Sequence, residues 1–590
     1  MDTDGGRGAR GERATPAAVV ERWIPGLRVV RGYERSWLRG DLVAGLVLTA
    51  LLVPQGMAYA ELAGLPPVTG LYTTVVALVG YAVFGPSPVL VLGPDSALGP
   101  LIAATILPLV AGDDPTEAVA LAGMLAIFMG LVCVVAGLGR LGTVAELLSK
   151  PVRVGFLNGV AVVVLVSQLP KLFGFSVDAE RTVGEASGFL SGVADGDTNG
   201  TTLAIGVACL AVILGFRRFV PRLPGVLVAV VGATVAVAAF DLTDRGISVV
   251  GSVPQGFPWP SFPSVALDDV GPLLAAALGL AFVTLADTTA FSRTFALRVG
   301  DDVDPNHEIV ALGAANLAAG FFSGFPVSAS ATRTAVAASS GARSQLTGLV
   351  GAGAIVVVLV AGNDLVRDLP SAALAAVVVA AGLSLFDLAE LRWLWRVRRS
   401  EFWLSTAALT GVIVAGVLEG IVIAVVLSLA NFIRRAWRPH DAVLGRVGDR
   451  KGYHDIERHP GAMQIPGLVL YRFDAPLFFA NAEHFLRRVK KFIAARGEPV
   501  RWVILAAEPV TDIDTTGAEI LSRLLDDLET DGTQLAFAEL KGPAKDRLRR
   551  YGLYDRIGDD RFFPTLGTAI DGYLAVSGVH WEDPTDRISG

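Results

Sequence analysis

Long apolar runs occupy most of the chain between residues 41 and 436, and they restrict its fold more than any other feature. A helix that crosses the hydrocarbon core of a bilayer needs about 20 mostly apolar residues. Only 18% of all residues are charged, whereas soluble proteins carry about 25%. The runs predict fourteen membrane-spanning helices, at residues 41–62, 68–84, 95–111, 117–137, 152–172, 202–219, 224–241, 271–290, 308–324, 328–340, 345–363, 370–387, 402–418 and 420–436.

Charges in the connections indicate how these helices are oriented, because Lys and Arg concentrate on the cytoplasmic side of a membrane. Eight arginines precede the first span, from Arg7 to Arg39. The even-numbered connections that follow are rich in Arg and Lys, whereas the odd-numbered ones carry acids such as Asp114, Asp268 and Asp269. An even number of spans returns the chain to its starting side. We therefore expect a multi-pass protein of the plasma (inner) membrane with both termini in the cytoplasm.

The composition changes after Arg438, where the sequence reads like that of a soluble domain. Its alternating and helically spaced apolar residues predict a small α/β domain, with strands at 467–473, 501–507 and 534–538 and helices at 482–495, 518–529 and 544–551. We expect five parts: a cytoplasmic segment without a secretory signal, an all-α membrane domain, a linker, the α/β domain and a tail. Their ranges are 1–39, 40–438, 439–465, 466–577 and 578–590.

The membrane domain shows signs of an internal repeat. One constant offset along the chain aligns the starts of two short, Pro-broken spans, and it also aligns one polar position in each of two other spans. The aligned pairs are Pro94 with Pro326, Ser96 with Ser328 and Gln55 with Asp287. Because each half holds an odd number of spans, seven, the second half must be inverted relative to the first. We expect repeats at about 40–241 and 270–436, with a binding site where the broken helices meet.

Asp287 lies in the otherwise apolar eighth span. A carboxylate at that depth costs about 3 kcal/mol unless it faces a cavity or a partner, so we interpret it as a coupling or substrate-gating group. Solvation near the helix end, or pairing with Arg293, is the alternative. In the first span, Gln55 and Tyr59 are one turn apart and share a face next to Pro54. Gln55 can donate to an anion beside the Tyr59 ring, or it can join two helices through a hydrogen bond.

Two short spans begin with Pro-containing turns, which predicts helix N-termini at mid-membrane. Such N-termini present unpaired N–H groups and partial positive charge, and they bind anions. At one of them, Ser330 and Thr332 add hydroxyls for a ligand or for N-capping, and Arg333 adds a full charge that needs an anion or a carboxylate such as Asp287. At the other, Asp95 is expected to be an N-cap, because a cavity carboxylate would repel an anion unless protonated.

No pattern in the sequence predicts an enzyme, a cofactor, a metal site or nucleic-acid binding. Cys133 and Cys209 lie in apolar runs and match no metal-ligand spacing. Glu508, Asp512 and Asp514 lie near one loop, but no base, nucleophile or ligand set accompanies them. A solvated face is the simpler interpretation.

Several motifs together resemble the SulP family of anion transporters, the relatives of sulfate permeases. They are the stretches 54–60 and 64–72, Gly93-Pro94, and 332–335 followed by Gly341. Thr332 stands where the family usually has Ser. The resemblance covers about residues 30–575 and implies the seven-plus-seven inverted-repeat fold shared with uracil permeases. It also implies a core domain that moves against a gate domain, and a homodimer.

The C-terminal domain resembles the STAS domain that SulP proteins carry. Asp514-Thr515-Thr516-Gly517 matches its Asp-Ser-Ser/Thr-Gly loop. In the anti-sigma-factor antagonists the Ser after that Asp is phosphorylated, which the resemblance maps to Thr515. A regulatory protein partner is implied in the same way. The alternative is that Thr515 is only a helix N-cap.

The resemblance implies a secondary active transporter of small inorganic anions. Sulfate is expected because its two charges match two helix ends and Arg333. Proton coupling through Asp287 is expected because Phe291 occupies the position, one turn later, where sodium-coupled relatives have Thr. Bicarbonate, chloride or dicarboxylate transport, an anion channel, and a sensor or scaffold role for the C-terminal domain are the alternatives.

Overall fold

The computed structural model describes residues 24–582 except 113, 142–148, 178, 180, 221–223, 253, 300–302, 362–365 and 449. The side chains of 28, 30, 290 and 293–299 are also outside the description, so the alternative pairing of Asp287 with Arg293 lies outside it too. Residues 1–23 of the predicted N-terminal segment and 583–590 of the predicted tail are not described. The chain forms two compact units that divide between Ser428 and Leu429.

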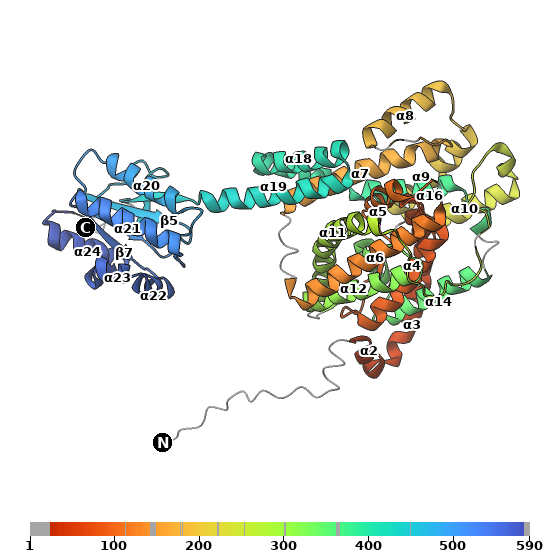
Figure 1. Cartoon of the computed structure of the whole chain (residues 1–590), viewed down its shortest axis with the longest axis horizontal. Helices are drawn as coiled ribbons and strands as arrows, with labels where there is room; N and C mark the ends of the chain where they lie inside the picture. The colour runs from red at the N-terminus through yellow and green to blue at the C-terminus, as the bar shows by residue number, and fades with distance from the viewer. Residues whose placement is uncertain are drawn as a thin grey trace, which may run out of the picture. The chain divides into compact units, whose positions relative to one another are not determined.

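Each of the fourteen predicted spans coincides with a helix that begins in the first unit (Figure 1). These helices are α3 (Leu38–Leu62), α4 (Pro67–Phe84), α5 (Gly99–Ile106), α6 (Pro115–Leu138), α7 (Lys150–Phe173), α9 (Gly200–Phe219), α10 (Gly225–Ala239), α11 (Leu267–Val299), α12 (Pro305–Phe321), α13 (Ala331–Ser339), α14 (Leu346–Ala361), α16 (Ser371–Leu385), α18 (Arg399–Ala415) and α19 (Val417–Trp437). Among the described residues, eight helical segments are long and apolar enough to cross a membrane. The number of crossings therefore stays a prediction.

In the described part of the first unit, three further α-helices lie outside the predicted spans: α2 (Gly26–Gly32), α8 (Thr182–Asp195) and α17 (Leu388–Val397). The last two occupy connections that the apolar runs left unassigned. Both mix apolar and charged residues, so a search for continuous apolar runs does not find them.

The helices divide into two groups by their packing. In the first group, α12 packs against α6 and α4, and α3 packs against α4 and α14; in the second group, α7 packs against α16 and α18, and α9 against α10 and α16. Each half of the chain contributes its first four predicted spans to the first group and its last three to the second. This division has the form expected for the predicted repeat. The broken helices α5 and α13 begin at Gly99 and Ala331, with the same spacing as Pro94 and Pro326.

Small residues allow the closest helix contact in the first group. A Cβ atom added to Gly130 of α6 would lie 2.7 Å from the carbonyl oxygen of Gly313 in α12, and one added to Gly320 would lie 2.4 Å from that of Gly123. Larger residues would force these backbones apart. Apolar side chains gain little from meeting each other in lipid, so close van der Waals contact of this kind holds membrane helices together.

A two-stranded sheet links the two halves of the first unit. β1 (Leu92–Gly93) and β2 (Ser328–Ala329) pair in antiparallel fashion, with Gly93 opposite Ser328. The N–H of Ser330 also donates to the carbonyl of Val91. Each strand leads into a short helix, so this pairing places the starts of α5 and α13 near each other.

The second unit contains a six-stranded sheet of order β4-β3-β5-β6-β7-β8. Strands β5 to β8 are parallel, and β3 and β4 are antiparallel. One apolar core lies on the face that carries Val469 and Tyr471, and another on the face that carries Leu468 and Leu470, as the period of two in a strand requires. The strands are β3 (Asp441–Arg446), β4 (Tyr453–Asp455), β5 (Leu468–Phe473), β6 (Trp502–Ala506), β7 (Gln534–Ala538) and β8 (Phe562–Phe563).

Helices cover both faces of this sheet. The larger core takes in α20 (Ala482–Ala494), α21 (Thr515–Thr530), α22 (Gly542–Arg550) and α23 (Leu553–Ile557), and the smaller core takes in α24 (Leu566–Ser577). All strands and helices predicted for this domain are present at nearly the predicted bounds.

The prediction of a linker over residues 439–465 is wrong. β3 lies within this range and pairs with β5, and β4 pairs with β3. Asp441 in β3 accepts hydrogen bonds from Tyr471 Oη (2.9 Å) and Arg488 Nε (2.6 Å). The polar composition of this range hid both strands. β4 is the edge strand and its three residues are only partly buried, whereas β3 lies inside the sheet with four of its six residues buried.

Candidate functional site

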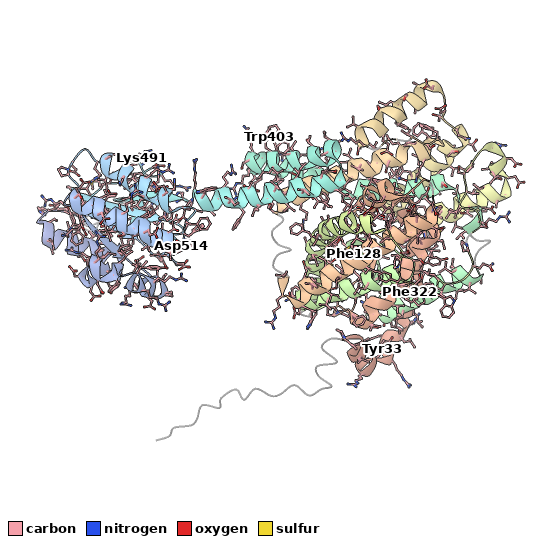
Figure 2. All side chains as sticks on the ribbon, in the orientation of Figure 1. Tyr33, Phe128, Phe322, Trp403, Lys491 and Asp514 are labelled. Atoms are coloured by element: carbon pink, nitrogen blue, oxygen red, sulfur yellow. The ribbon has the colours of Figure 1, made fainter. Side chains whose placement is uncertain are left out.

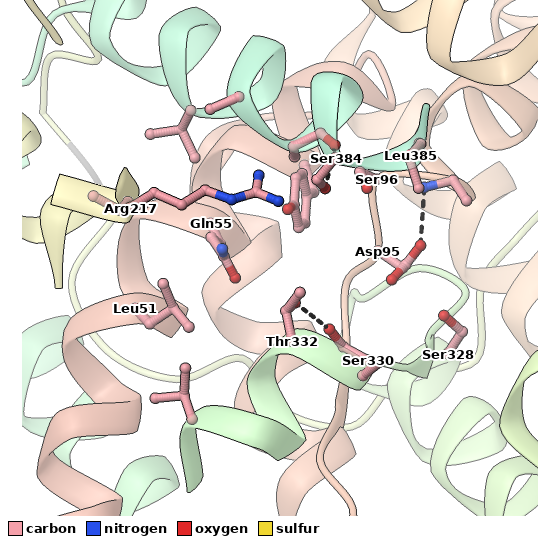
Figure 3. A pocket seen from close by; sticks show the side chains of 18 of the residues that line it. Leu51, Gln55, Asp95, Ser96, Arg217, Ser328, Ser330, Thr332, Ser384 and Leu385 are labelled. Atoms are coloured by element: carbon pink, nitrogen blue, oxygen red, sulfur yellow. Dashed lines mark hydrogen bonds between the residues drawn. The ribbon is translucent and has the colours of Figure 1, made fainter. Parts of the chain in front are cut away.

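A cavity of about 1270 Å³ opens between the two helix groups (Figure 3). Its wall takes residues from α3, α11 and α13 of the first group and from α7, α9 and α16 of the second. Six of the seven residues predicted to bind substrate or couple transport line it: Gln55, Tyr59, Asp95, Asp287, Ser330 and Thr332.

The start of α13 forms the best-defined polar edge of the cavity. Ser330 is the N-cap of this helix, and its hydroxyl accepts from the N–H of Arg333 (3.4 Å). The hydroxyls of Ser330 and Thr332 lie 3.1 Å apart. Both side chains also line the cavity, so the capping and ligand-contact interpretations of Ser330 are compatible. Thr332 does not cap the helix and keeps its hydroxyl available to a ligand.

Asp95 lies at the start of the other broken span, but it is not the N-cap of α5. That position belongs to Leu98, which provides no side-chain cap. Asp95 Oδ1 instead accepts from the N–H of Ala97 (2.9 Å), and the Asp95 carbonyl accepts from the N–H groups of Leu98 and Gly99. The carboxylate thus stabilises the turn that leads into α5, just before the helix begins, while it also faces the cavity.

Arg333 points away from the cavity. Its side chain is 1% exposed, and its guanidinium donates to the carbonyl oxygens of Pro94 (2.5 Å) and Gly93 (3.2 Å). Asp287 is not its partner: two of its nitrogen atoms are satisfied by backbone carbonyls of the other broken span, whereas its buried Nε has no hydrogen-bond partner among the described residues. Arg333 therefore ties the starts of α13 and α5 together and can act on a ligand only through its charge.

Gln55 and Tyr59 of α3 form the opposite wall, as their spacing predicted. Gln55 makes no hydrogen bond with another described residue, so its amide is available inside the cavity. The guanidinium of Arg217 extends from α9 toward Gln55 in Figure 3. An amide and a guanidinium that face the same space can both donate to an oxyanion.

Asp287 of α11 lines the cavity and pairs with Arg153 of α7. The distance from Arg153 Nη1 to Asp287 Oδ1 is 3.6 Å, and the two side chains are 35% and 22% exposed. The two residues belong to different helix groups, so this ion pair crosses the cavity.

The basic residues of the cavity were not predicted from the sequence. Lys150, Arg153 and Arg217 all line it, although their positions at the ends of spans indicated only membrane orientation. Lys150 pairs with Glu390 (2.6 Å). One usable signal was present: Arg153 lies inside the start of a predicted span, where a charge requires a partner. The cations, hydroxyls and amides of the lining suit a small anion, and apolar side chains form the rest of the wall.

The described residues contain no group of three or more His, Cys, Asp or Glu placed to hold a metal ion. Cys133 and Cys209 are buried and unpaired by disulfides.

Thr515 lies in the second unit at the first position of α21, where it is exposed. The N-cap of this helix is Asp514, whose Oδ1 accepts from the N–H of Gly517 (2.7 Å) and whose Oδ2 accepts from that of Phe479 (3.0 Å). Figure 2 labels Asp514 on this unit. The alternative interpretation of Thr515 as the cap is therefore wrong, and its hydroxyl is accessible.

Two family models match the chain. The model of the sulfate permease family matches residues 38–408, and that of the STAS domain matches residues 459–569. A "Probable sulfate transporter" of Mycobacterium tuberculosis (strain CDC 1551 / Oshkosh) is 42% identical over 558 residues, which cover 95% of this chain and 99% of the relative. "Sulfate transporter 4.1, chloroplastic" of Arabidopsis thaliana is 32% identical over 577 residues, covering 93% and 82%.

Solved structures share the fold. The murine Solute Carrier 26 family member A9 anion transporter superimposes with a TM-score of 0.88 at 22% identity, covering 97% of each chain. The transmembrane domain of a cyanobacterium bicarbonate transporter superimposes with a TM-score of 0.58 at 22% identity, covering 67% of this chain and 98% of that domain. The polytopic helical domain with a C-terminal STAS domain is thus the architecture of this chain.

Proposed function

The chain belongs to the sulfate permease family, and on that premise we propose that it carries sulfate across a membrane as a proton-coupled secondary transporter. The observation that carries the proposal is the meeting of two helix starts, held by β1–β2, at a polar cavity that also contains basic side chains. Relatives named sulfate transporters that align over nearly the whole chain support the choice of sulfate.

Sulfate suits this cavity for electrostatic reasons. Helix N-termini stabilise anions through unpaired N–H groups and partial positive charge, and α13 contributes the hydroxyls of Ser330 and Thr332 beside its N-terminus. Arg217 and the Gln55 amide face the same space. A dianion gains more from several cations and dipoles than a monoanion does, since Coulomb energy scales with charge. Bicarbonate and chloride are the competing ligands.

Alternating access fits the division into two helix groups. The cavity lies between them, and broken helices near mid-membrane are typical of transporters in which one repeat-related bundle moves against another. Arg153 and Asp287 join the groups on the cavity wall, so a relative movement would separate them. Asp287 is the acid proposed to couple transport to protons, and Phe291 beside it offers no oxygen ligand for sodium.

Other parts of the proposal follow from family membership. We propose a homodimer in the plasma (inner) membrane with both termini in the cytoplasm, and a regulatory role for the STAS domain in which Thr515 is modified or contacts a partner protein. No enzymatic reaction is assigned to either unit.

Labelled-sulfate uptake into proteoliposomes tests the function. We expect saturable uptake that rises when the outside is made more acidic than the inside and that is unaffected by replacing sodium with potassium. Excess unlabelled selenate, a close analogue, should compete, whereas chloride should not. Sulfate uptake that requires a sodium gradient contradicts the proposal. So does sulfate uptake that bicarbonate abolishes at concentrations too low for sulfate itself to saturate the transporter.

A further inference from the structure

Helix α17 carries tryptophan and arginine side chains that the transport cavity does not use. It connects α16 to α18 and packs against α7. Leu394 is buried, whereas Trp393 and Trp395 are 50% and 44% exposed, and Trp403 at the start of α18 is 60% exposed. Figure 2 shows Trp403 at the edge of the helix bundle. Exposed tryptophans at the ends of membrane helices are typical of the interface between lipid and water.

Beside these tryptophans lies a second pocket, of about 290 Å³, far smaller than the transport cavity. Its walls are Leu388, Leu391, Trp395 and Phe402, and its basic residues are Arg392 and Arg396. The rings of Trp395 and Phe402 pack edge to face, with centroids 4.9 Å apart. The pocket therefore combines an apolar floor with two guanidinium groups.

Arg392 and Arg396 are one turn apart on the same helix, so their side chains lie on the same face. Within the described part of the chain, neither forms a hydrogen bond or an ion pair with another residue. Neighbouring cations are matched internally: Arg398 pairs with Glu401 (3.1 Å), Arg399 lies over the Trp395 ring (5.2 Å), and Lys150 pairs with Glu390 (2.6 Å). The two arginines of the pocket are thus available to an external anion.

We propose that this pocket binds the phosphate headgroup of an anionic phospholipid in the leaflet where α17 lies. Paired guanidinium groups match the geometry of a phosphate, and basic residues beside a membrane helix attract anionic lipids. The walls formed by Leu388, Leu391 and Phe402 suit the glycerol and first methylenes of an acyl chain. A free inorganic anion would gain nothing from these apolar walls, which favours the lipid as the occupant.

Such a lipid would hold the second helix group at a defined depth in the membrane. α17 follows α16 directly, and Glu390 of α17 holds Lys150 at the cavity wall. A lipid bound to α17 therefore contacts the helix that directly follows α16, and α16 lines the transport cavity. The binding site itself does not depend on which anion is carried.

Native mass spectrometry of the purified full-length protein tests this site, with phosphatidylglycerol compared with phosphatidylcholine. Each interfacial basic residue contributes about fivefold to binding of anionic lipid. The double variant Arg392→Gln/Arg396→Gln should therefore bind phosphatidylglycerol about 25-fold more weakly, while its binding of phosphatidylcholine stays unchanged. Trp395→Ala should weaken phosphatidylglycerol binding without any change in charge.

Arg434→Gln/Arg435→Gln is the matched control, because it removes two charges near the end of α19 and leaves the pocket intact. An equal loss in this control would indicate a diffuse electrostatic attraction and overturn the proposal. Displacement of phosphatidylglycerol by millimolar inorganic phosphate would assign the pocket to a soluble anion instead. Unfolding temperatures in phosphatidylcholine show whether the variants fold, and the lysine variant Arg392→Lys/Arg396→Lys should keep most of the lipid binding.

Discussion

Arg153 Nη1 of α7 lies 3.6 Å from Asp287 Oδ1 of α11, so an ion pair joins the two helix groups across the cavity. Among the described residues that line the cavity, this is the only ion pair between the two helix groups; the Lys150–Glu390 pair lies within the second group. Any movement of one group against the other changes this distance. The pair therefore reports on, and resists, the conformational change proposed for transport.

Replacing Arg153 with Gln should reduce sulfate transport at least tenfold, which corresponds to about 1.4 kcal/mol in kcat/KM. The cost to folding should be small, about 1 kcal/mol or less, because both side chains are partly exposed. Arg153→Lys should restore part of the activity, since it keeps the charge. Arg217→Gln is the comparison: it should raise KM without altering the dependence on the proton gradient. Identical effects of the two glutamine variants would contradict the special role of Arg153.

Asp287→Asn should abolish the stimulation of uptake by an inward proton gradient, because the amide cannot bind and release a proton. Exchange of sulfate for sulfate should persist at a rate within about tenfold of the parent, since the carboxamide keeps the shape of the side chain. Counterflow measured in parallel with net uptake separates these effects. Gradient-driven uptake that survives in Asp287→Asn would assign coupling to another group.

A second ion pair joins the helix groups at the other end of α7. Lys171 Nζ lies 3.4 Å from Glu61 Oε1 of α3. Removing it with Glu61→Gln should favour the conformation open at this end by about two- to fivefold, as expected for a partly exposed pair worth about 0.4–1 kcal/mol. Hydrogen exchange of residues 62–66 should then increase. Glu117→Gln on α6, where the carboxylate accepts from the N–H of Ala111 (2.8 Å) and belongs to no described ion pair with Lys171, should leave the exchange of that segment unchanged.

Helix α8 should respond to pH through Glu185. Burial raises the pKa of Glu185 to about 7, and nearby Lys171 opposes this rise. Because the folded state favours the protonated acid, the contribution to stability is complete below about pH 4.5 and is lost as pH rises through about 7. Hydrogen exchange in α8, corrected for its intrinsic pH dependence, should therefore accelerate over this range.

Glu185→Gln should remove this pH response of α8, whereas substitution of Asp195, an exposed acid on the same helix, by Asn should keep it. The contact that loosens is the packing of Phe189 on Phe173 and Phe175, whose ring centroids lie 5.0 and 5.9 Å away. A pH response that is unchanged in Glu185→Gln would rule out this residue as its source.

Asp41 should be essential for stability, because its buried carboxylate collects five hydrogen bonds. The donors are Tyr33 Oη, the N–H groups of Arg343 and Ser344, and the hydroxyls of Ser344 and Thr347. Asp41→Ala leaves several donors unsatisfied and should cost about 2–4 kcal/mol. Asp41→Asn should cost less, since one oxygen remains. The unfolding temperature in detergent measures both, and equal stability of parent and alanine variant would contradict the argument.

The positions of the long helices and of the three central strands β5, β6 and β7 could be predicted from the sequence because they depend on local patterns. An apolar run long enough to cross a bilayer has one stable form in lipid, where each backbone group must be satisfied within its own segment. α17 escaped prediction because its apolar residues are interrupted by charged ones, and β4 because it is only three residues long.

In the candidate site, too, some features could be predicted from the sequence and others could not. Six of the seven residues predicted to bind substrate or couple transport line one cavity, although Asp95 is not the N-cap that was expected. Broken helices and intramembrane polar groups have few alternatives to a shared cavity. Arg333 turned out to bind the Gly93 and Pro94 carbonyls, and Arg153 to face Asp287. In each case the partner belongs to the other half of the membrane domain. Spacing within one helix carries no information about such contacts.

The sequence by itself thus determined that this chain is a polytopic membrane protein with a soluble α/β domain, and which residues are polar inside the apolar spans. Only the tertiary structure decided which of them share a cavity and which satisfy each other. Hydropathy acts along a single segment, whereas the partner of a buried charge depends on how separate helices pack, and that packing is set by many weak contacts distributed over the whole bundle.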